Sequence, residues 1–184
     1  AYNIDHELID QFLYSMEMDL HHHEYDREKF EEYILGSAEV VGLMCLKVFV
    51  EGDKKKYEML KPAAMKLGAA FQKINFLRDL KADHQKLGRS YFPNVDLSNF
   101  TQEDKERIER EIEADFRDGL KGIRKLPKGA RLGVYIAYVY FFQLFKKIRE
   151  THPKRLMKER IRVPNSAKYS LLLSSYFRHR MNLL

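Results

Sequence analysis

The sequence predicts an all-α protein, and three observations support this prediction. Glycine and proline are few, at 9 and 5 of 184 residues, and most lie between segments of helical periodicity. Alternation of period two, the mark of strands, is nearly absent. Apolar residues make up 45% of the chain and charged residues 33%, a balance that excludes a disordered protein. No linker is long enough to divide the chain, so we expect a single domain over residues 1–184.

Six helices are expected, at residues 4–20, 26–49, 53–86, 101–122, 128–150 and 165–184. The first rests on its periodicity. The second starts at Asp26, a suitable N-cap, and stops at the segment Glu51-Gly52-Asp53. The third contains Pro62, which predicts a kink or a break. Gly88 then begins a loop.

The starts of the last three expected helices are also indicated by residues at or next to each start. Thr101 is an N-cap followed by acidic residues, which favours a helix start there. Pro127 precedes the fifth helix, and the sixth starts near Asn165 or Ser166.

Small residues cluster at one-turn spacing in the second helix: Gly36, Ser37, Ala38 and Gly42. They would let either a neighbouring helix or a ligand approach the backbone closely, and the spacing leaves both readings open.

The net charge of +6 conceals a steep gradient along the chain. Residues 1–40 carry a net charge of −9, residues 41–119 carry +1, and residues 120–184 carry +14. A basic end could meet nucleic acid, anionic lipid, a phosphorylated substrate or the acidic end of the same fold. The charge gradient alone does not distinguish among these possible partners.

One helical face gathers polar side chains that suit a metal and a phosphate. Gln72, Asn75, Asp79 and Asp83 are spaced so that they line one face of the third helix. Two carboxylates one turn apart suit Mg²⁺, which is commonly shared between carboxylates and substrate phosphates. Acidic pairs at this spacing also occur on exposed faces paired with Lys or Arg, and spacing alone leaves that alternative open.

The segment QKINFLRDLKADHQKLGRSYFP resembles the second aspartate-rich motif of the phytoene/squalene synthase family. That motif runs Gln-x-x-Asn-x-x-Arg-Asp-x-x-x-Asp, followed by Gly-Arg, an aromatic residue and Pro. The matching positions are Gln72, Asn75, Arg78, Asp79, Asp83, Gly88, Arg89, Tyr91 and Pro93. Residues 33–42 resemble the family's Tyr-x-x-x-x-Ala-x-x-Val-Gly helix. The opening segment that ends MEMDL and the C-terminal helices resemble the bacterial phytoene synthase branch, so the likeness covers nearly the whole chain.

This resemblance implies an isoprenoid synthase-type helical bundle. The family joins two prenyl diphosphates head to head through a cyclopropyl diphosphate, here two geranylgeranyl diphosphates to phytoene in carotenoid biosynthesis. The implied cofactor is Mg²⁺, or Mn²⁺ in its place. The implied metal ligands are Asp79 and Asp83, the implied catalytic residue is Tyr33, and the implied substrate-binding residues are Gln72, Asn75, Arg78, Arg89 and Tyr91.

The sequence departs from the family pattern in one respect. The family has a first aspartate-rich motif before the tyrosine helix, and no Asp-x-x-x-Asp pair in an apolar context precedes Tyr33. We therefore expect residues 1–184 to be the C-terminal portion of a head-to-head trans-isoprenyl diphosphate synthase domain, with its N-terminal helices missing. Such a fragment is expected to be inactive alone, and its exposed apolar faces favour self-association.

The sequence is also compatible with other functions. The nearest is squalene or diapophytoene synthesis from farnesyl diphosphate, and another is a non-catalytic helical scaffold. A nucleic-acid binder is disfavoured by the acidic first third. We expect a cytoplasmic protein, and the basic tail is either a solvated helix or a peripheral contact with anionic lipid at the inner face of the membrane.

Overall fold

The computed structural model describes residues 2, 4–21, 25–181 and 183, and these residues contain no strand. The all-α prediction is therefore confirmed. The helices are α1 (His6–His21), α2 (Arg27–Ile34), the π-helical η1 (Leu35–Glu39), α3 (Val40–Phe49), α4 (Lys54–Leu87), the short 3₁₀ helix η2 (Leu97–Asn99), α5 (Gln102–Ile123), α6 (Lys128–Arg149), α7 (Pro153–Leu156) and α8 (Asn165–Arg180).

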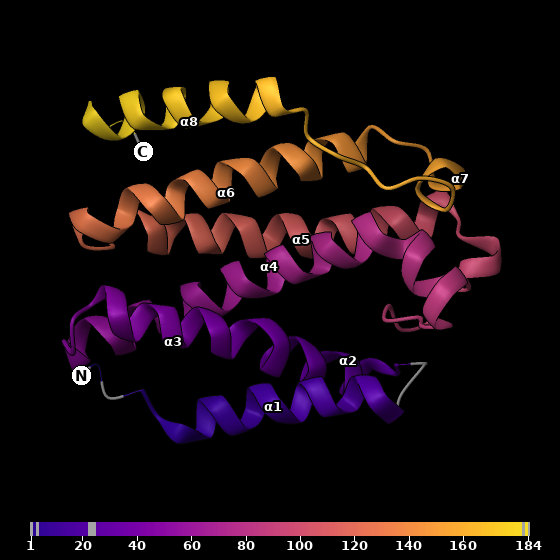
Figure 1. Cartoon of the computed structure of the whole chain (residues 1–184), viewed down its shortest axis with the longest axis horizontal. Coiled ribbons are helices and arrows are strands. Elements are labelled where there is room, and N and C mark those ends of the chain that lie inside the picture. The colour runs from indigo at the N-terminus through magenta and orange to yellow at the C-terminus, as the bar shows by residue number, and fades with distance from the viewer. Residues whose placement is uncertain (1, 3, 22–24, 182, 184) are drawn as a thin grey trace.

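The helices are layered almost in chain order (Figure 1). The hairpin of α1 with α2, η1 and α3 lies on one side, α4 crosses the middle, and α5, α6 and α8 follow on the other side. The long helix α4 packs against α3 on one side and α5 on the other. The face predicted to bear the metal and phosphate ligands therefore belongs to the central element.

Two predicted elements differ in detail from the structure. The expected helix 26–49 begins as predicted, since the Asp26 side chain accepts a hydrogen bond from the Lys29 backbone N–H at 2.9 Å, but η1 widens it in the middle. The helix containing Pro62 is not broken. Pro62 lies in an exposed position and removes one backbone donor, and packing of α4 on both sides holds the helix together.

A buried ion pair ties α4 to α5. The Lys73 Nζ donates to Asp115 Oδ2 at 2.8 Å, and both side chains are at most 10% exposed. Lys66 approaches the other oxygen of Asp115 at 3.2 Å. Since each buried charge has a partner, the contact fixes how α4 lies on α5.

The small residues of the second predicted helix serve packing and also leave space. A Cβ on Gly36 would lie 1.8 Å from Ser15 Oγ and 2.4 Å from the Gln11 backbone oxygen, so only glycine allows α1 this close. Ser37 and Gly42, in contrast, line a cavity. The helix-packing reading is therefore confirmed at Gly36, and the approach of a ligand at Ser37 and Gly42 stays a prediction.

Within the described part of the chain, no helix has both the length and the apolar character needed to cross a membrane.

Candidate active site

The polar face of α4 is assembled as the spacing predicts. Asn75 Nδ2 donates to Gln72 Oε1 at 3.3 Å, and Gln72 Nε2 donates to Ser37 Oγ of η1 at 3.3 Å. Asp79 and Asp83 follow on successive turns of the same helix. The helix ends at Gly88, whose left-handed φ of 61° turns the chain sharply.

Two guanidinium groups hold the Asp79 carboxylate. Arg78 Nη2 donates to Asp79 Oδ2 at 2.6 Å, and Arg160 Nε lies 2.6 Å from Asp79 Oδ1. Asp79 is 21% exposed, so it does not lie on a fully exposed helix face, although it has the arginine partners that the alternative reading expects. Arg160 comes from the segment between α7 and α8, eighty-one residues away in sequence. Sequence spacing therefore gave no means of placing Arg160 beside Asp79.

The ionised form of the second carboxyl group, that of Asp83, is unfavourable in this environment. Burial and the negative charge of Asp79 together raise the pKa of Asp83 to about 6, against the opposing effects of Arg89 and Arg160. A divalent cation between the two carboxylates would relieve this repulsion.

The donor set of this site suits Mg²⁺ shared with a ligand. Among the residues that the structure describes, no cluster of three or more His, Cys, Asp or Glu side chains could hold a metal ion. On this face of α4, the described residues offer the Asp79–Asp83 pair. Mg²⁺ usually keeps waters and binds through one or two carboxylates plus substrate phosphates, so the pair fits that mode and does not fit a closed structural site.

A third carboxylate, Asp19 on α1, lies at the centre of a cluster that sequence reasoning did not select. The hydroxyls of Tyr33 and Tyr91 donate to Asp19 at 3.0 and 3.1 Å, and Arg89 Nη1 lies 3.4 Å from it. Asp19 lacks a second acid one turn away, so no spacing rule marks it. The one signal was its place in the MEMDL segment.

Tyr33 is held as a neutral hydroxyl. Burial raises its pKa well above the ordinary value, and the charges of Tyr91 and Asp19 act in the same direction. The ring is 4% exposed and packs 5.8 Å from Phe76. Tyr33 does not line the cavity, whereas Ser37, four residues later, does.

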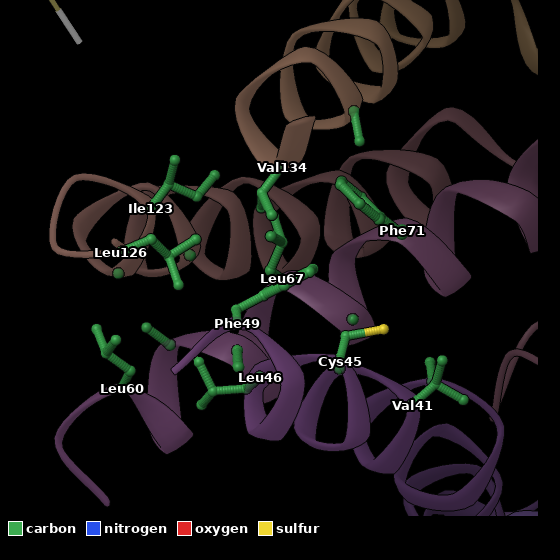
Figure 2. A pocket seen from close by; sticks show the side chains of 18 of the residues that line it. Val41, Cys45, Leu46, Phe49, Leu60, Leu67, Phe71, Ile123, Leu126 and Val134 are labelled. Carbon is green, nitrogen blue, oxygen red and sulfur yellow. The ribbon is translucent and has the colours of Figure 1, made fainter. Parts of the chain in front are cut away.

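An apolar cavity of about 640 Å³ lies between α3, α4, α5 and α6 (Figure 2). Ser37, Gln72 and Asn75 make one end polar, and Leu60 and Leu126 are at the other end. Its lining includes small residues from η1 and from all four of these helices: Ala38, Gly42, Ala63, Ala64, Gly68, Gly119, Gly122, Ala130, Gly133 and Ala137.

Cys45 contributes its thiol to this cavity (Figure 2). Cys45 stands in an apolar stretch without a partner cysteine, which by itself favours a small core residue, but the side chain is exposed. Partial burial nevertheless raises the pKa of the Cys45 thiol. The apolar sequence of α3 likewise favours a helix buried on most faces, and one side of it faces the cavity instead.

A basic hollow of about 530 Å³ adjoins the carboxylate pair. Four cations line it, Arg78, Arg160, Arg162 and Lys168, together with Tyr140 and the first residues of α8. This cluster accounts for part of the positive charge of the C-terminal third, and its position beside Asp79 suits an anionic ligand.

A sequence profile of squalene/phytoene synthases matches residues 1–167. The chain belongs to the squalene/phytoene synthase family. A curated relative, the bifunctional lycopene cyclase/phytoene synthase of Blakeslea trispora, is 28% identical over 176 residues. The match covers 81% of this chain and 28% of that relative.

The fold has a counterpart among solved structures. The crystal structure of squalene synthase HpnC from Alicyclobacillus acidocaldarius matches with a TM-score of 0.58 at 19% sequence identity. The match covers 97% of this chain and 62% of that structure, so the chain spans less than two thirds of either protein. The isoprenoid synthase-type fold expected from the family motifs is thereby confirmed.

Proposed function

We propose that this chain carries the second aspartate-rich half of a head-to-head prenyl synthase site, which condenses two geranylgeranyl diphosphates to phytoene. One observation supports this most directly. The apolar cavity has its polar end at Asn75, one helical turn before Asp79, so an apolar tail and a diphosphate would fit one continuous site.

Each part of the site has a chemical task in this proposal. Arg78 and Arg89 would bind diphosphate oxygens, and Asp79 and Asp83 would hold Mg²⁺, which neutralises charge on a leaving diphosphate. Gln72 and Asn75 would orient the group at the mouth of the cavity. The apolar walls would keep water from the carbocation that forms when diphosphate leaves.

The length of the cavity favours a C20 substrate. Leu60 and Asn75 both line the cavity, and Asn75 lies fifteen residues after Leu60, which is a rise of about 22 Å along α4. An extended isoprene unit of four carbon–carbon bonds, each about 1.5 Å long, spans about 5 Å, so four units need about 20 Å. The farnesyl alternative would leave the far end near Leu60 empty.

Calorimetric titration of the chain with geranylgeranyl thiodiphosphate, with and without Mg²⁺, tests this proposal. We expect binding that requires Mg²⁺ and is lost in Asp79→Ala and in Asp83→Ala. Glu113→Ala, which removes an exposed carboxylate on α5, is the control and should bind normally. Equal binding by both aspartate variants would contradict the site. Tighter binding of the farnesyl analogue would favour squalene or diapophytoene synthesis, and no binding of either would favour the scaffold.

We further propose that the chain alone does not complete the reaction, because the family uses two aspartate-rich motifs. Incubation of the 184-residue chain with geranylgeranyl diphosphate and Mg²⁺ should yield no phytoene. Efficient phytoene formation would contradict this proposal.

We also propose that the protein is cytoplasmic and makes a peripheral contact with anionic lipid through α8. An apolar stripe faces outward, formed by Tyr169, Leu172, Leu173, Tyr176 and Phe177, each at least 45% exposed. The helix carries Lys168, Arg178 and Arg180 and no acidic residue. The chain should float with phosphatidylglycerol vesicles and less with phosphatidylcholine vesicles. Equal recovery with both would contradict an electrostatic contact.

A further inference from the structure

The Asp19 carboxylate accepts hydrogen bonds from three separate segments: the residue Tyr25 before α2, the helix α2 itself, and the loop after α4. Besides Tyr33 and Tyr91, the Tyr25 hydroxyl lies 3.5 Å from its carboxylate. The three rings pack against one another with centroids 5.1–5.3 Å apart. Asp19 lies on α1, Tyr33 on α2, and Tyr91 with Arg89 in the loop after α4. The carboxylate therefore joins the helix hairpin to the end of the helix that bears Asp79 and Asp83.

The direction of its hydrogen bond to Asp19 decides whether the hydroxyl proton of Tyr33 is available to another group. A tyrosine hydroxyl has one proton and two lone pairs. Tyr33 donates its proton to Asp19, and its hydroxyl also meets that of Tyr91. In this arrangement Tyr33 has no proton to give to a leaving diphosphate.

Arg89 is anchored through both of its Nη atoms. Its Nη2 donates to the Asp19 backbone oxygen at 2.5 Å, and its Nη1 lies 3.3 Å from the Tyr91 hydroxyl. Its Nε is buried and has no hydrogen-bond partner among the described residues. A buried guanidinium N–H without an acceptor is costly, and an oxygen of a bound ligand would satisfy it.

We propose that Asp19 is the positioning residue of this site, holding Arg89 for a diphosphate oxygen and keeping the proton of Tyr33 engaged. The inference rests on the proposed function, because it names what orients groups that the function assigns to substrate.

A positioning role and a purely electrostatic role of Asp19 predict opposite effects of its removal on anion binding. Removing a negative charge near an anion site should tighten anion binding if charge alone matters. If Asp19 positions Arg89, its loss should weaken anion binding, because an unanchored arginine no longer presents its N–H groups in a fixed direction.

The experiment measures binding of inorganic pyrophosphate with Mg²⁺ to the 184-residue chain by calorimetry. Asp19→Asn keeps the shape of the side chain, and we expect about tenfold weaker binding, the value of one charge-assisted hydrogen bond. Asp19→Glu keeps the charge and should recover part of the loss. Asp10→Asn removes an exposed charge on the same helix and should bind as the wild type does.

Circular dichroism melting checks that each variant is folded. If Asp19→Asn is unfolded, Tyr91→Phe decides, since it removes one hydroxyl of the cluster and should weaken binding by a smaller factor. Wild-type or tighter binding in the folded variant, with Asp79→Ala still abolishing binding, would overturn the role of Asp19 alone. No pyrophosphate binding by the wild type would overturn the proposed function together with this inference.

Discussion

At the scale of single residues, the ionised form of Asp83 that the proposed metal site needs is also the form that destabilises the fold. Its pKa is raised to about 6 in the folded chain, above about 3.9 for a free aspartate. The favourable contribution of neutral Asp83 is therefore complete below about pH 4 and is lost as pH rises through 6. At pH 7 the ionised carboxylate destabilises the fold.

Asp83→Asn should accordingly stabilise the chain at pH 7 by on the order of 1 kcal/mol, after allowance for solvent screening of a partly exposed group. The gain should shrink when pH falls to 5. Urea unfolding at both pH values measures it, with Asp10→Asn as the control. An equal gain at both values would show that the raised pKa is not its cause.

At the scale of elements, the start of α5 depends on a reciprocal cap. The Asp104 backbone N–H donates to Thr101 Oγ1 at 3.1 Å, and the Thr101 backbone N–H donates to Asp104 Oδ2 at 3.3 Å. Thr101→Ala should cost about 1 kcal/mol in the free energy of unfolding. Thr101→Ser retains the hydroxyl and should cost much less. Equal losses in urea unfolding would contradict the cap.

The contact between α1 and η1 makes a second prediction at this scale. Gly36→Ala must push α1 away from Ser15 and Gln11, and should destabilise the chain by about 3 kcal/mol. Gly133→Ala is the matched change on α6, where an added Cβ meets open space. It should stabilise by about 0.5–1 kcal/mol through helix propensity. Similar effects of the two substitutions on unfolding would contradict the packing assigned to Gly36.

At the scale of the whole molecule, the single cysteine reports whether a prenyl tail occupies the cavity. Cys45 is exposed and lines that cavity. Geranylgeranyl thiodiphosphate with Mg²⁺ should slow the reaction of Cys45 with a thiol reagent at least about tenfold, because a bound tail excludes the reagent.

Pyrophosphate with Mg²⁺ is the control for that measurement. It would occupy the polar end without filling the apolar part, and should leave the thiol reactivity unchanged. Protection by pyrophosphate as well would point to a conformational change, and no protection by either ligand would contradict a tail bound along α3.

The sequence determined what depends on near neighbours in the chain. Helical periodicity and caps such as Asp26 and Thr101 predicted the long helices, since each signal acts within one or two turns. The face that presents Gln72, Asn75, Asp79 and Asp83 followed from the helical repeat, and the motif in which these residues lie led to the correct family.

Only the tertiary structure decided which distant groups meet. Arg160 reaches Asp79 and Asp19 gathers Tyr91 and Arg89 because segments far apart in sequence pack side by side, a result that no local spacing encodes. Packing also left space beside α3, which placed Cys45 on a cavity wall and not in the core. The nature of the candidate site could be inferred from its residues, whereas the charges and hydroxyls that surround it follow from how α1, α4 and the segment before α8 come together.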